Sequence, residues 1–291
     1  MGRNRIRHTW NLRTETPRTE SARNSIQRSS IQRSRIGRSR IDTGSPTFAR
    51  YATWSRAVRL LNDFRFEQTD PARFYGAIAI DTAQMVADWH GARMDDAVVL
   101  DVGGGPGYFA DAFELLGAHY ISVEPDPAEM HAGGLDHRGG VRGSGQHLPF
   151  ADDSMDVTFS SNVVEHTSAP WAMADEMVRV TRPGGTVIIS YTLWWGPFGG
   201  HEMGLTHYAG GHRAARWYTR RHGHPPKNLY GTSLFPVTAA QGLAWADSAA
   251  SRAELVGAFP RYLPRRLWWI MRVPGLREVL GTNLVLVLRK R

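Results

Sequence analysis

Apolar residues recur along the chain with two different periods, which change near residue 92. Before that point they return every three or four residues, as at Trp54, Val58 and Leu61, and Pro71 suits the first turn of a further helix. We therefore expect N-terminal helices over 46–92 that pack on the core.

After residue 92, short continuous apolar runs alternate with amphipathic stretches of helical length. Seven runs have the length of strands, at 97–102, 119–124, 141–145, 155–162, 186–191, 255–263 and 283–288. Strands that alternate with helices form a parallel sheet with helices on both faces. The expected fold class is therefore α/β: a three-layer α/β/α, doubly wound fold with a mostly parallel seven-stranded sheet.

The pattern breaks down over 193–250, which is rich in Trp, Tyr, His and Gly and shows no steady period. A stretch of this length is too long for a plain connection, so it is either a lid over a substrate or disordered. Its aromatic content favours the lid. C-terminal strands and a basic, Trp-rich segment follow over 251–291.

The net charge of +8 is confined to the N-terminus. Residues 1–42 hold eleven arginines against three acidic side chains, whereas the remaining 249 residues hold 24 basic and 24 acidic ones. With so few large apolar side chains, residues 1–45 are expected to be disordered. They are expected to be a nucleic-acid-binding arm, a transit peptide or, in the favoured interpretation, functionally silent, for instance as upstream sequence read from a start codon assigned too early. The balanced charge of the folded part gives no reason to expect nucleic acid there.

The chain has no cysteine, which excludes disulfides and cysteine zinc sites and fits a reducing compartment. No apolar run reaches the roughly 18 residues of a membrane span, and no secretory signal is present. We therefore expect a cytoplasmic protein.

Four glycines, Gly103, Gly104, Gly105 and Gly107, follow the first predicted strand. Ligands of open parallel sheets bind at the carboxyl ends of the strands, where bare backbone lets a ligand approach and the next helix offers free N–H groups. The spacing G-x-G-x-G differs from the dinucleotide fingerprint, which would need glycine where a tyrosine stands. A tight turn would use these glycines for steric reasons alone. Glu124, ending the second predicted strand, favours a cofactor, since a carboxylate there can accept hydrogen bonds from ribose hydroxyls.

Four motifs resemble, in order and spacing, those of class I S-adenosylmethionine-dependent methyltransferases, the type 11 subfamily above all. They are LDVGGGPGYF, VEPDPAEM, GSGQHLPFADDSMDVTFSSNVVEH and EMVRVTRPGGTVIIS. The resemblance covers about 97–192, and the flanking WWGPFGGHEMGLTHYAGG and the Trp-rich C-terminus resemble uncharacterised actinobacterial members. It implies a Rossmann-like methyltransferase fold, a core over 93–192 and S-adenosylmethionine as the cofactor.

The resemblance also assigns residues to the parts of this cofactor. It implies that Asp101, Gly103, Gly105 and Gly107 surround the methionine moiety. It implies that Glu124 binds the ribose hydroxyls.

The adenine would lie beside Pro125 or Asp126. Members of the family usually carry an acidic residue after the third strand, and the aligned position here is Ser144. Ser144 would then accept the hydrogen bond from the adenine, with Gln146 or His147 assisting.

Catalytic candidates follow the fourth predicted strand and lie in the lid. By resemblance, Asn162 would face the cofactor near its methyl group. His166 suits removal of a proton from an attacking hydroxyl, and a capping or packing role is the alternative. In the lid, His201, Glu202 and His207 are either base and substrate clamp or polar loop residues. The lid begins like the H-E-x-x-H zinc motif, but a leucine stands at the second histidine position, so no metal site is expected.

Residues 261–291 carry eight basic side chains against one acidic side chain, interleaved with tryptophans. Over 261–278 this sequence suits contact with an anionic membrane surface, which would fit a lipid-like acceptor. In the favoured alternative, Leu267, Trp268 and Ile270 cover the sheet edge and the arginines are solvated.

These features predict a methyltransferase that moves a methyl group to a small-molecule or lipid-like acceptor. Oxygen is the favoured acceptor atom because histidines suit hydroxyl activation, and carbon and nitrogen stay open. The alternatives are an NAD(P)-dependent oxidoreductase, which the glycine spacing disfavours, and a cofactor-binding protein without turnover, which the serine at the adenine position allows.

Overall fold

The computed structural model describes residues 52–64, 71–91, 93–131 and 139–291. These residues all belong to one compact unit. The N-terminal tail expected over 1–45 lies outside the described residues.

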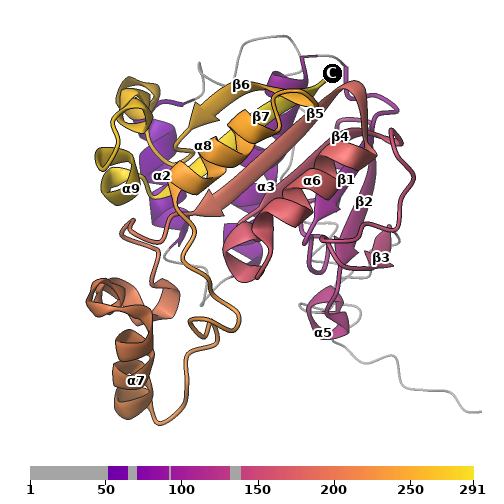
Figure 1. Cartoon of the computed structure of the whole chain (residues 1–291). Helices are drawn as coiled ribbons and strands as arrows, with labels where there is room; N and C mark the ends of the chain where they lie inside the picture. The colour runs from indigo at the N-terminus through magenta and orange to yellow at the C-terminus, as the bar shows by residue number, and fades with distance from the viewer. Residues whose placement is uncertain (1–51, 65–70, 92, 132–138) are drawn as a thin grey trace, which may run out of the picture. The chain divides into compact units, whose positions relative to one another are not determined.

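Seven strands of the described chain form one sheet in the order β3-β2-β1-β4-β5-β7-β6 (Figure 1). They are β1 Val98–Val102, β2 His119–Glu124, β3 Gly140–Arg142, β4 Met155–Ser161, β5 Thr181–Thr192, β6 Ala253–Phe259 and β7 Asn283–Lys290. Neighbouring strands from β3 to β5 run parallel, and β7 runs antiparallel to both β5 and β6. The predicted doubly wound, mostly parallel sheet is confirmed.

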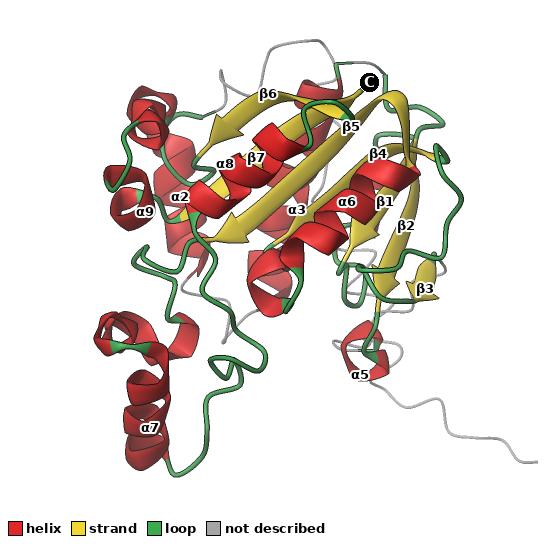
Figure 2. Ribbon diagram, in the orientation of Figure 1, coloured by secondary structure: helices red, strands yellow, loops and turns green. Residues whose placement is uncertain are grey.

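Helices cover both faces of this sheet, as Figure 2 shows in red. They are α2 Trp54–Phe64, α3 Pro71–His90, α4 Ala110–Glu114, α5 Pro127–Met130, α6 Pro170–Val180, α7 Gly211–His222, α8 Ala239–Ser248 and α9 Leu276–Leu280. Between them lie the 3-10 segments η4 Val164–His166, η5 His201–Ala209 and η6 Arg265–Arg272. Side chains of α6 and α8 pack on one face of the sheet, and those of α3 and α4 on the other.

The strands are apolar on both sides because both faces are covered. In β1, Leu100 and Val102 belong to the core under α6 and α8, whereas Val99 belongs to the core under α3 and α4. The run NLVLVL of β7 divides between the two cores in the same way. A strand buried on both faces reads as a continuous apolar run, which is why these strands could be found in the sequence.

The strand order reverses between β1 and β4. From β1 the chain adds β2 and β3 on one side, then returns to place β4 and β5 on the other. Ligands of open α/β sheets bind at this switch point, beyond the carboxyl ends of the strands. The glycines after β1 and the segment after β4 both lie there.

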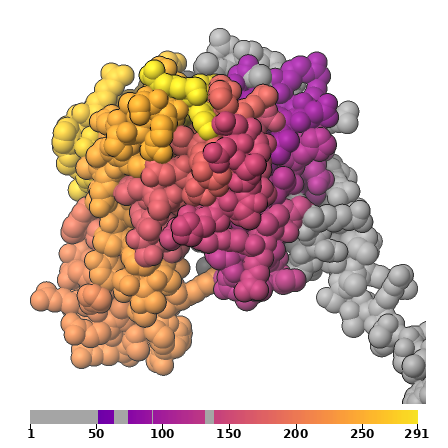
Figure 3. Space-filling view, turned by 45° about the vertical axis from the view of Figure 1, so that its right-hand side comes forward, coloured from indigo at the N-terminus to yellow at the C-terminus, as the bar shows by residue number. Residues whose placement is uncertain are grey.

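The chain between β5 and α8 stands apart from the two helical layers. It contains η5 and α7 and has a small core of its own, made by Trp194, Met203, Ala214, Ala215 and Leu234. In Figure 3 its orange surface is separated from the neighbouring magenta surface by a hollow. Residues 239–248 of the expected lid region form α8 instead, and Trp245 of this helix packs into the core of the sheet.

The C-terminal segment covers the outer strand of the sheet. The ring of Trp268 stacks on Phe259 of β6, with ring centroids 4.4 Å apart, and Ile270 and Met271 are buried. The edge-covering interpretation therefore holds for these side chains. Trp269 is about half exposed and points away from the core.

Among the described residues, no helix combines the length and the apolar character that crossing a membrane requires.

Candidate active site

The glycine loop after β1 holds backbone conformations that other residues rarely adopt. Gly103, Gly105 and Gly107 have φ angles of +81°, +51° and +80°. A Cβ on Gly103 would lie 2.5 Å from Val163 Cγ2, whereas a Cβ on Gly105 would meet no atom within 4 Å. The loop is thus closed against the chain that follows β4 and open on the side of Gly105, where a ligand can approach the backbone.

Gly104 is required for a different reason, since its φ is not positive. A Cβ at this position would lie 2.7 Å from Ser122 Cβ and 2.9 Å from Asp101 Oδ2. Close packing of the loop against β2 therefore excludes any side chain here.

Asp101 is a buried carboxyl group directly before this loop. Tyr120 Oη donates a hydrogen bond of 2.6 Å to Asp101 Oδ2. Burial raises the pKa of Asp101 to about 7, although the Tyr120 hydrogen bond acts in the opposite direction, and Glu124 adds a small repulsion. Near neutral pH, the side chain is therefore poised between its neutral and charged forms.

Glu124 connects the glycine loop to the start of α5. Its Oε2 accepts a hydrogen bond from the Gly105 amide at 3.3 Å, and its Oε1 accepts one from the Asp126 amide at 3.1 Å. Burial raises the pKa of this half-buried carboxyl group, and the two amide hydrogen bonds lower it. Each carboxylate oxygen keeps a second lone pair for a ligand hydroxyl.

Only some of the residues expected around the adenine lie close to one another. Pro125 and Asp126 are exposed, and Asp126 Oδ1 accepts a hydrogen bond of 2.8 Å from the Ala128 amide as the N-cap of α5. Ser144 follows β3, which pairs with β2 so that Glu124 lies beside Arg142. Glu124 and Ser144 therefore lie at the same end of the neighbouring strands β2 and β3.

Gln146 and His147, which were expected to assist Ser144, differ in what their side chains contact. Ser144 Oγ accepts a hydrogen bond of 3.2 Å from the Gln146 amide, and Ser144 O accepts one of 3.1 Å from the His147 amide. The Gln146 side chain donates to Thr167 Oγ1 at 2.7 Å, whereas His147 is exposed. Gln146 therefore links the β3 turn to the chain after η4.

Asn162 ends β4 with a φ of +58°, a left-handed conformation that asparagine tolerates better than most residues. Its amide donates to Ser190 O at 2.8 Å. The buried Oδ1 has no hydrogen-bond partner among the described residues. A buried acceptor without a partner is unusual, and this one lies at the switch point.

Three polar side chains meet beyond the carboxyl ends of β4 and β5. His166 and His201 lie edge to face with ring centroids 5.0 Å apart, and Glu165 reaches the same point. The ligand atoms of the three side chains lie within 4.8 Å of one another. His201 has a φ of +48°, which for histidine is a strained conformation of the kind found at functional sites.

Glu165 is a site residue that the sequence did not assign. Its carboxylate is buried, with Oε1 accepting a hydrogen bond of 3.0 Å from the Thr192 amide and Oε2 unpartnered among the described residues. The only signal in the sequence is its place beside His166. Its proximity to His201 depends on the fold, since 36 residues separate the two.

The other two lid candidates lie outside this cluster. Glu202 is exposed and accepts hydrogen bonds from the amide and side chain of Asn228. His207 is buried, its Nδ1 bonded to Gly204 O at 2.7 Å and its ring packed edge to face on Trp194. Both hold the segment between β5 and α8 together.

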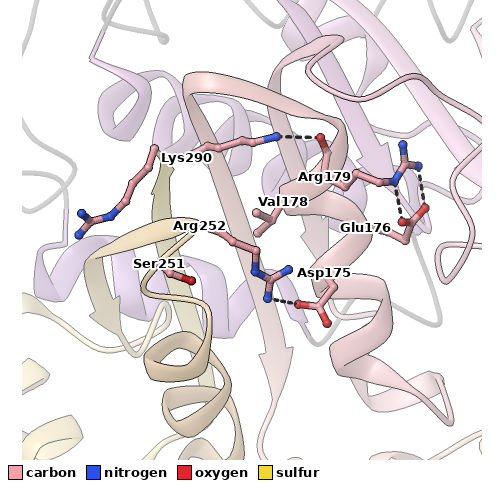
Figure 4. A pocket seen from close by; sticks show the side chains of 8 residues that line it. Asp175, Glu176, Val178, Arg179, Ser251, Arg252 and Lys290 are labelled. Atoms are coloured by element: carbon pink, nitrogen blue, oxygen red, sulfur yellow. Dashed lines mark hydrogen bonds and ion pairs between the residues drawn. The ribbon is translucent and has the colours of Figure 1, made fainter.

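A surface pocket of about 460 Å³ lies at the end of the strands away from the glycine loop (Figure 4). Four of its charged groups are paired with one another, Arg252 with Asp175 and Arg179 with Glu176. Lys290 of β7 lines it, and this end of β7 pairs with the beginning of β5. The pocket is therefore remote from the carboxyl ends of the parallel strands.

Comparisons with known proteins agree with this geometry. A methyltransferase-domain family model matches residues 100–189. A protein of Mycobacterium marinum described as an uncharacterized methyltransferase is 61% identical over 252 residues, which cover 84% of this chain and 98% of that protein. A relative from Mycobacteroides abscessus is 58% identical over 255 residues, covering 84% and 97%. The chain belongs to this methyltransferase family. It is the type 11 family of class I methyltransferases, and S-adenosylmethionine is the cofactor.

Solved structures of low sequence identity are also similar to the methyltransferase. A SAM-dependent methyltransferase from Thermotoga maritima has a TM-score of 0.47 and 16% identity over 82% of this chain and 99% of its own. One from Mesorhizobium loti has a TM-score of 0.47 and 14% identity over 71% and 97%.

Proposed function

We propose that this methyltransferase transfers the methyl group to an oxygen atom of a small-molecule or lipid-like acceptor. The observation that carries the proposal is the meeting of His166, His201 and Glu165 beside the chain that closes on the glycine loop. Val163, which packs against Gly103, is only two residues before Glu165. The cluster is thus next to the proposed cofactor site, on the side of the lid segment.

The residues at the switch point fit S-adenosylmethionine. Gly105 leaves room for its amino-acid end, and the carboxylate of Glu124 has lone pairs free for two ribose hydroxyls. Asp101 would supply negative charge near a cationic ligand, and Asn162 Oδ1 is a buried acceptor without a partner among the described residues. Ser144 stands at the β2–β3 edge for the adenine.

When bound, the cofactor supplies an electrophilic methyl group on a positively charged sulfur. The protein must then bind the acceptor in line with that methyl group, exclude water and remove one proton. The acceptor hydroxyl would lose its proton to a base on the protein as its oxygen takes up the methyl group.

His201 is the proposed base, with His166 beside it. Burial lowers the pKa of His201, and the nearby Glu165 carboxylate only partly offsets this effect. The imidazole is therefore neutral at neutral pH and can accept a proton. Its Nδ1 lies 3.3 Å from Gly199 O, which leaves Nε2 as the accepting atom.

A lipid-like acceptor is supported by an apolar surface that we call the α2–η6–α9 face. It contains the exposed side chains of Trp54, Val58, Leu61, Trp269, Leu276, Val279 and Leu280. Exposed Arg265, Arg266 and Arg272 belong to η6, and the Arg265 amide donates to Ala52 O at 2.7 Å, which joins η6 to the start of α2. Apolar side chains with arginines beside them suit the surface of an anionic membrane.

The segment over 193–238, with η5 and α7, is proposed to cover the acceptor. It supplies His201, and Ser233 of the same segment holds His166 through a 2.7 Å contact from His166 Nδ1 to the Ser233 carbonyl. This segment therefore positions both imidazoles.

The proposal is tested by methyl transfer from methyl-labelled S-adenosylmethionine to a lipid and small-molecule extract of the source cell. We expect label in O-methyl products with the wild type and at least a hundredfold slower transfer with His201→Ala. The variant should bind the cofactor as the wild type does. Label found only on nitrogen or carbon would overturn the oxygen assignment, and binding without any transfer would favour a protein without turnover.

A further inference from the structure

The cluster of Glu165, His166 and His201 presents three acceptor atoms to one point. The His166 Nδ1 contact is with a carbonyl oxygen, so this nitrogen carries a hydrogen and Nε2 is the ring atom left for a ligand. The same reasoning holds for His201, whose Nδ1 faces the Gly199 carbonyl. Glu165 Oε2 is buried and has no partner among the described residues.

A buried carboxylate oxygen without a partner is costly. A cation bound between the three side chains removes that penalty. One carboxyl group and two imidazoles match the donor set of a divalent transition metal.

The surroundings of the three side chains are those of metal ligands. A histidine that binds a metal usually donates its other ring N–H to a carbonyl or carboxylate, as His166 and His201 do with the Ser233 and Gly199 carbonyls. The second oxygen of Glu165 is held by the Thr192 amide. Each ligand is therefore oriented by backbone from a different part of the fold.

We propose that Glu165, His166 and His201 form a binding site for one divalent transition metal ion with open coordination positions. The ligand atoms lie within 4.8 Å of one another, whereas ligands about 2.1 Å from a tetrahedral ion are roughly 3.4 Å apart. Contraction on the order of 1 Å closes the site. Zn²⁺ and Mn²⁺ suit two imidazoles and a carboxylate, and Mg²⁺, which prefers oxygen ligands, should bind far more weakly.

For the reaction, this inference rests on the proposed function. A metal in the open site would bind the acceptor oxygen and lower the pKa of its hydroxyl proton. The ion and the proton would compete for the same lone pair of His201 Nε2: with the metal bound the hydroxyl proton would leave to solvent, and without it His201 would accept the proton. Metal binding as such does not depend on methyl transfer.

The test is calorimetric titration of the chelator-treated full chain with Zn²⁺ and, separately, Mn²⁺. We expect one ion per chain and at least tenfold weaker binding with Glu165→Gln and with His201→Ala. Glu165→Gln keeps an oxygen for the Thr192 amide, so it should preserve the fold. The matched control is the double variant His222→Ala/His224→Ala, which removes two exposed imidazoles whose rings lie 6.2 Å apart on the lid segment.

The outcomes are distinct. No binding to the wild type, or binding that only the His222/His224 variant reduces, would overturn the inference. Each preparation is also titrated with S-adenosylmethionine, so a protein that binds the cofactor and no metal would refute the metal site and leave the proposed function intact. A protein that binds metal but no cofactor would do the reverse.

Discussion

Gly105 shows how a single residue without a side chain can shape the proposed cofactor site. Its φ is +51°, and no atom lies within 4 Å of the place where a Cβ would be. Gly91, at the end of α3, has a φ of +71° and equally open surroundings, but it is far from the switch point in the topology. Gly105 and Gly91 therefore differ in whether a ligand at the switch point would contact them.

Gly105→Ala and Gly91→Ala are therefore expected to lower the free energy of unfolding by a similar amount, about 1–2 kcal/mol, for the left-handed conformation. Only Gly105→Ala should weaken S-adenosylmethionine binding, because its methyl group would occupy the open side of the loop. Urea unfolding and calorimetric titration measure the two effects. Equal cofactor affinity in both variants would show that the loop is a turn and not a binding surface.

Asp101 gives a pH dependence whose sign can be stated. Its pKa is raised to about 7 in the folded protein and returns to the ordinary value near 3.8 on unfolding. Between these values the folded state holds a proton that the unfolded state has lost, so the contribution of Asp101 to stability falls as pH rises from about 4 to 7. The slope is about 1.4 kcal/mol per pH unit at most.

Asp101→Asn removes this titration. The free energy of unfolding of Asp101→Asn minus that of the wild type should increase from pH 5 to pH 7 and level off above it, as urea unfolding at several pH values would show. A difference that is constant with pH, or that shrinks, would contradict the raised pKa.

At the scale of elements, β1, β4 and β7 were predicted to within about two residues because they are buried on both faces, whereas β3, an exposed strand at the edge of the sheet, and the start of β5 were predicted less well. The run HYISVE gave β2 at its observed bounds. The short helix after the glycine loop begins only at Ala110, since Gly107 holds a left-handed conformation that delays helical hydrogen bonding.

The part that the sequence did not predict is the cluster of Glu165, His166 and His201. Metal-binding motifs have their ligands at short spacing in the sequence, and the candidate of that kind was the H-E pair at residues 201 and 202. The structure separates that pair, because Glu202 turns to Asn228 while His201 turns to His166. Contacts across 35 residues come from the topology of β4 and β5, which periodicity does not specify.

The α2–η6–α9 face supports a prediction at this scale. The double variant Trp269→Ser/Val279→Ser should reduce sedimentation of the protein with anionic phospholipid vesicles at least fivefold, since both side chains are about half exposed and would enter the interface. Trp217→Ser on α7 removes a similarly exposed tryptophan and serves as the control. Loss of binding with the control alone, or no vesicle binding by the wild type, would contradict the membrane contact.

At the scale of the whole molecule, the proposed function depends on how the sheet places three segments of the chain. The sheet brings the glycine loop after β1, Glu124 at the end of β2 and the chain after β4 to the same edge. The lid segment adds His201 to this edge from beyond β5. The fold thus places the proposed cofactor site beside the proposed base, which is the minimum that the proposed methyl transfer to oxygen needs.

The most direct test of this account is calorimetric titration with S-adenosylmethionine, and with NAD for comparison. We predict micromolar binding of S-adenosylmethionine, no comparable binding of NAD, and at least tenfold weaker binding, about 1.4 kcal/mol, in Glu124→Ala. Glu114→Ala removes the same charge from an exposed position on α4 and should bind as the wild type does. Absence of S-adenosylmethionine binding, or equal binding by the wild type and Glu124→Ala, would contradict the proposed site.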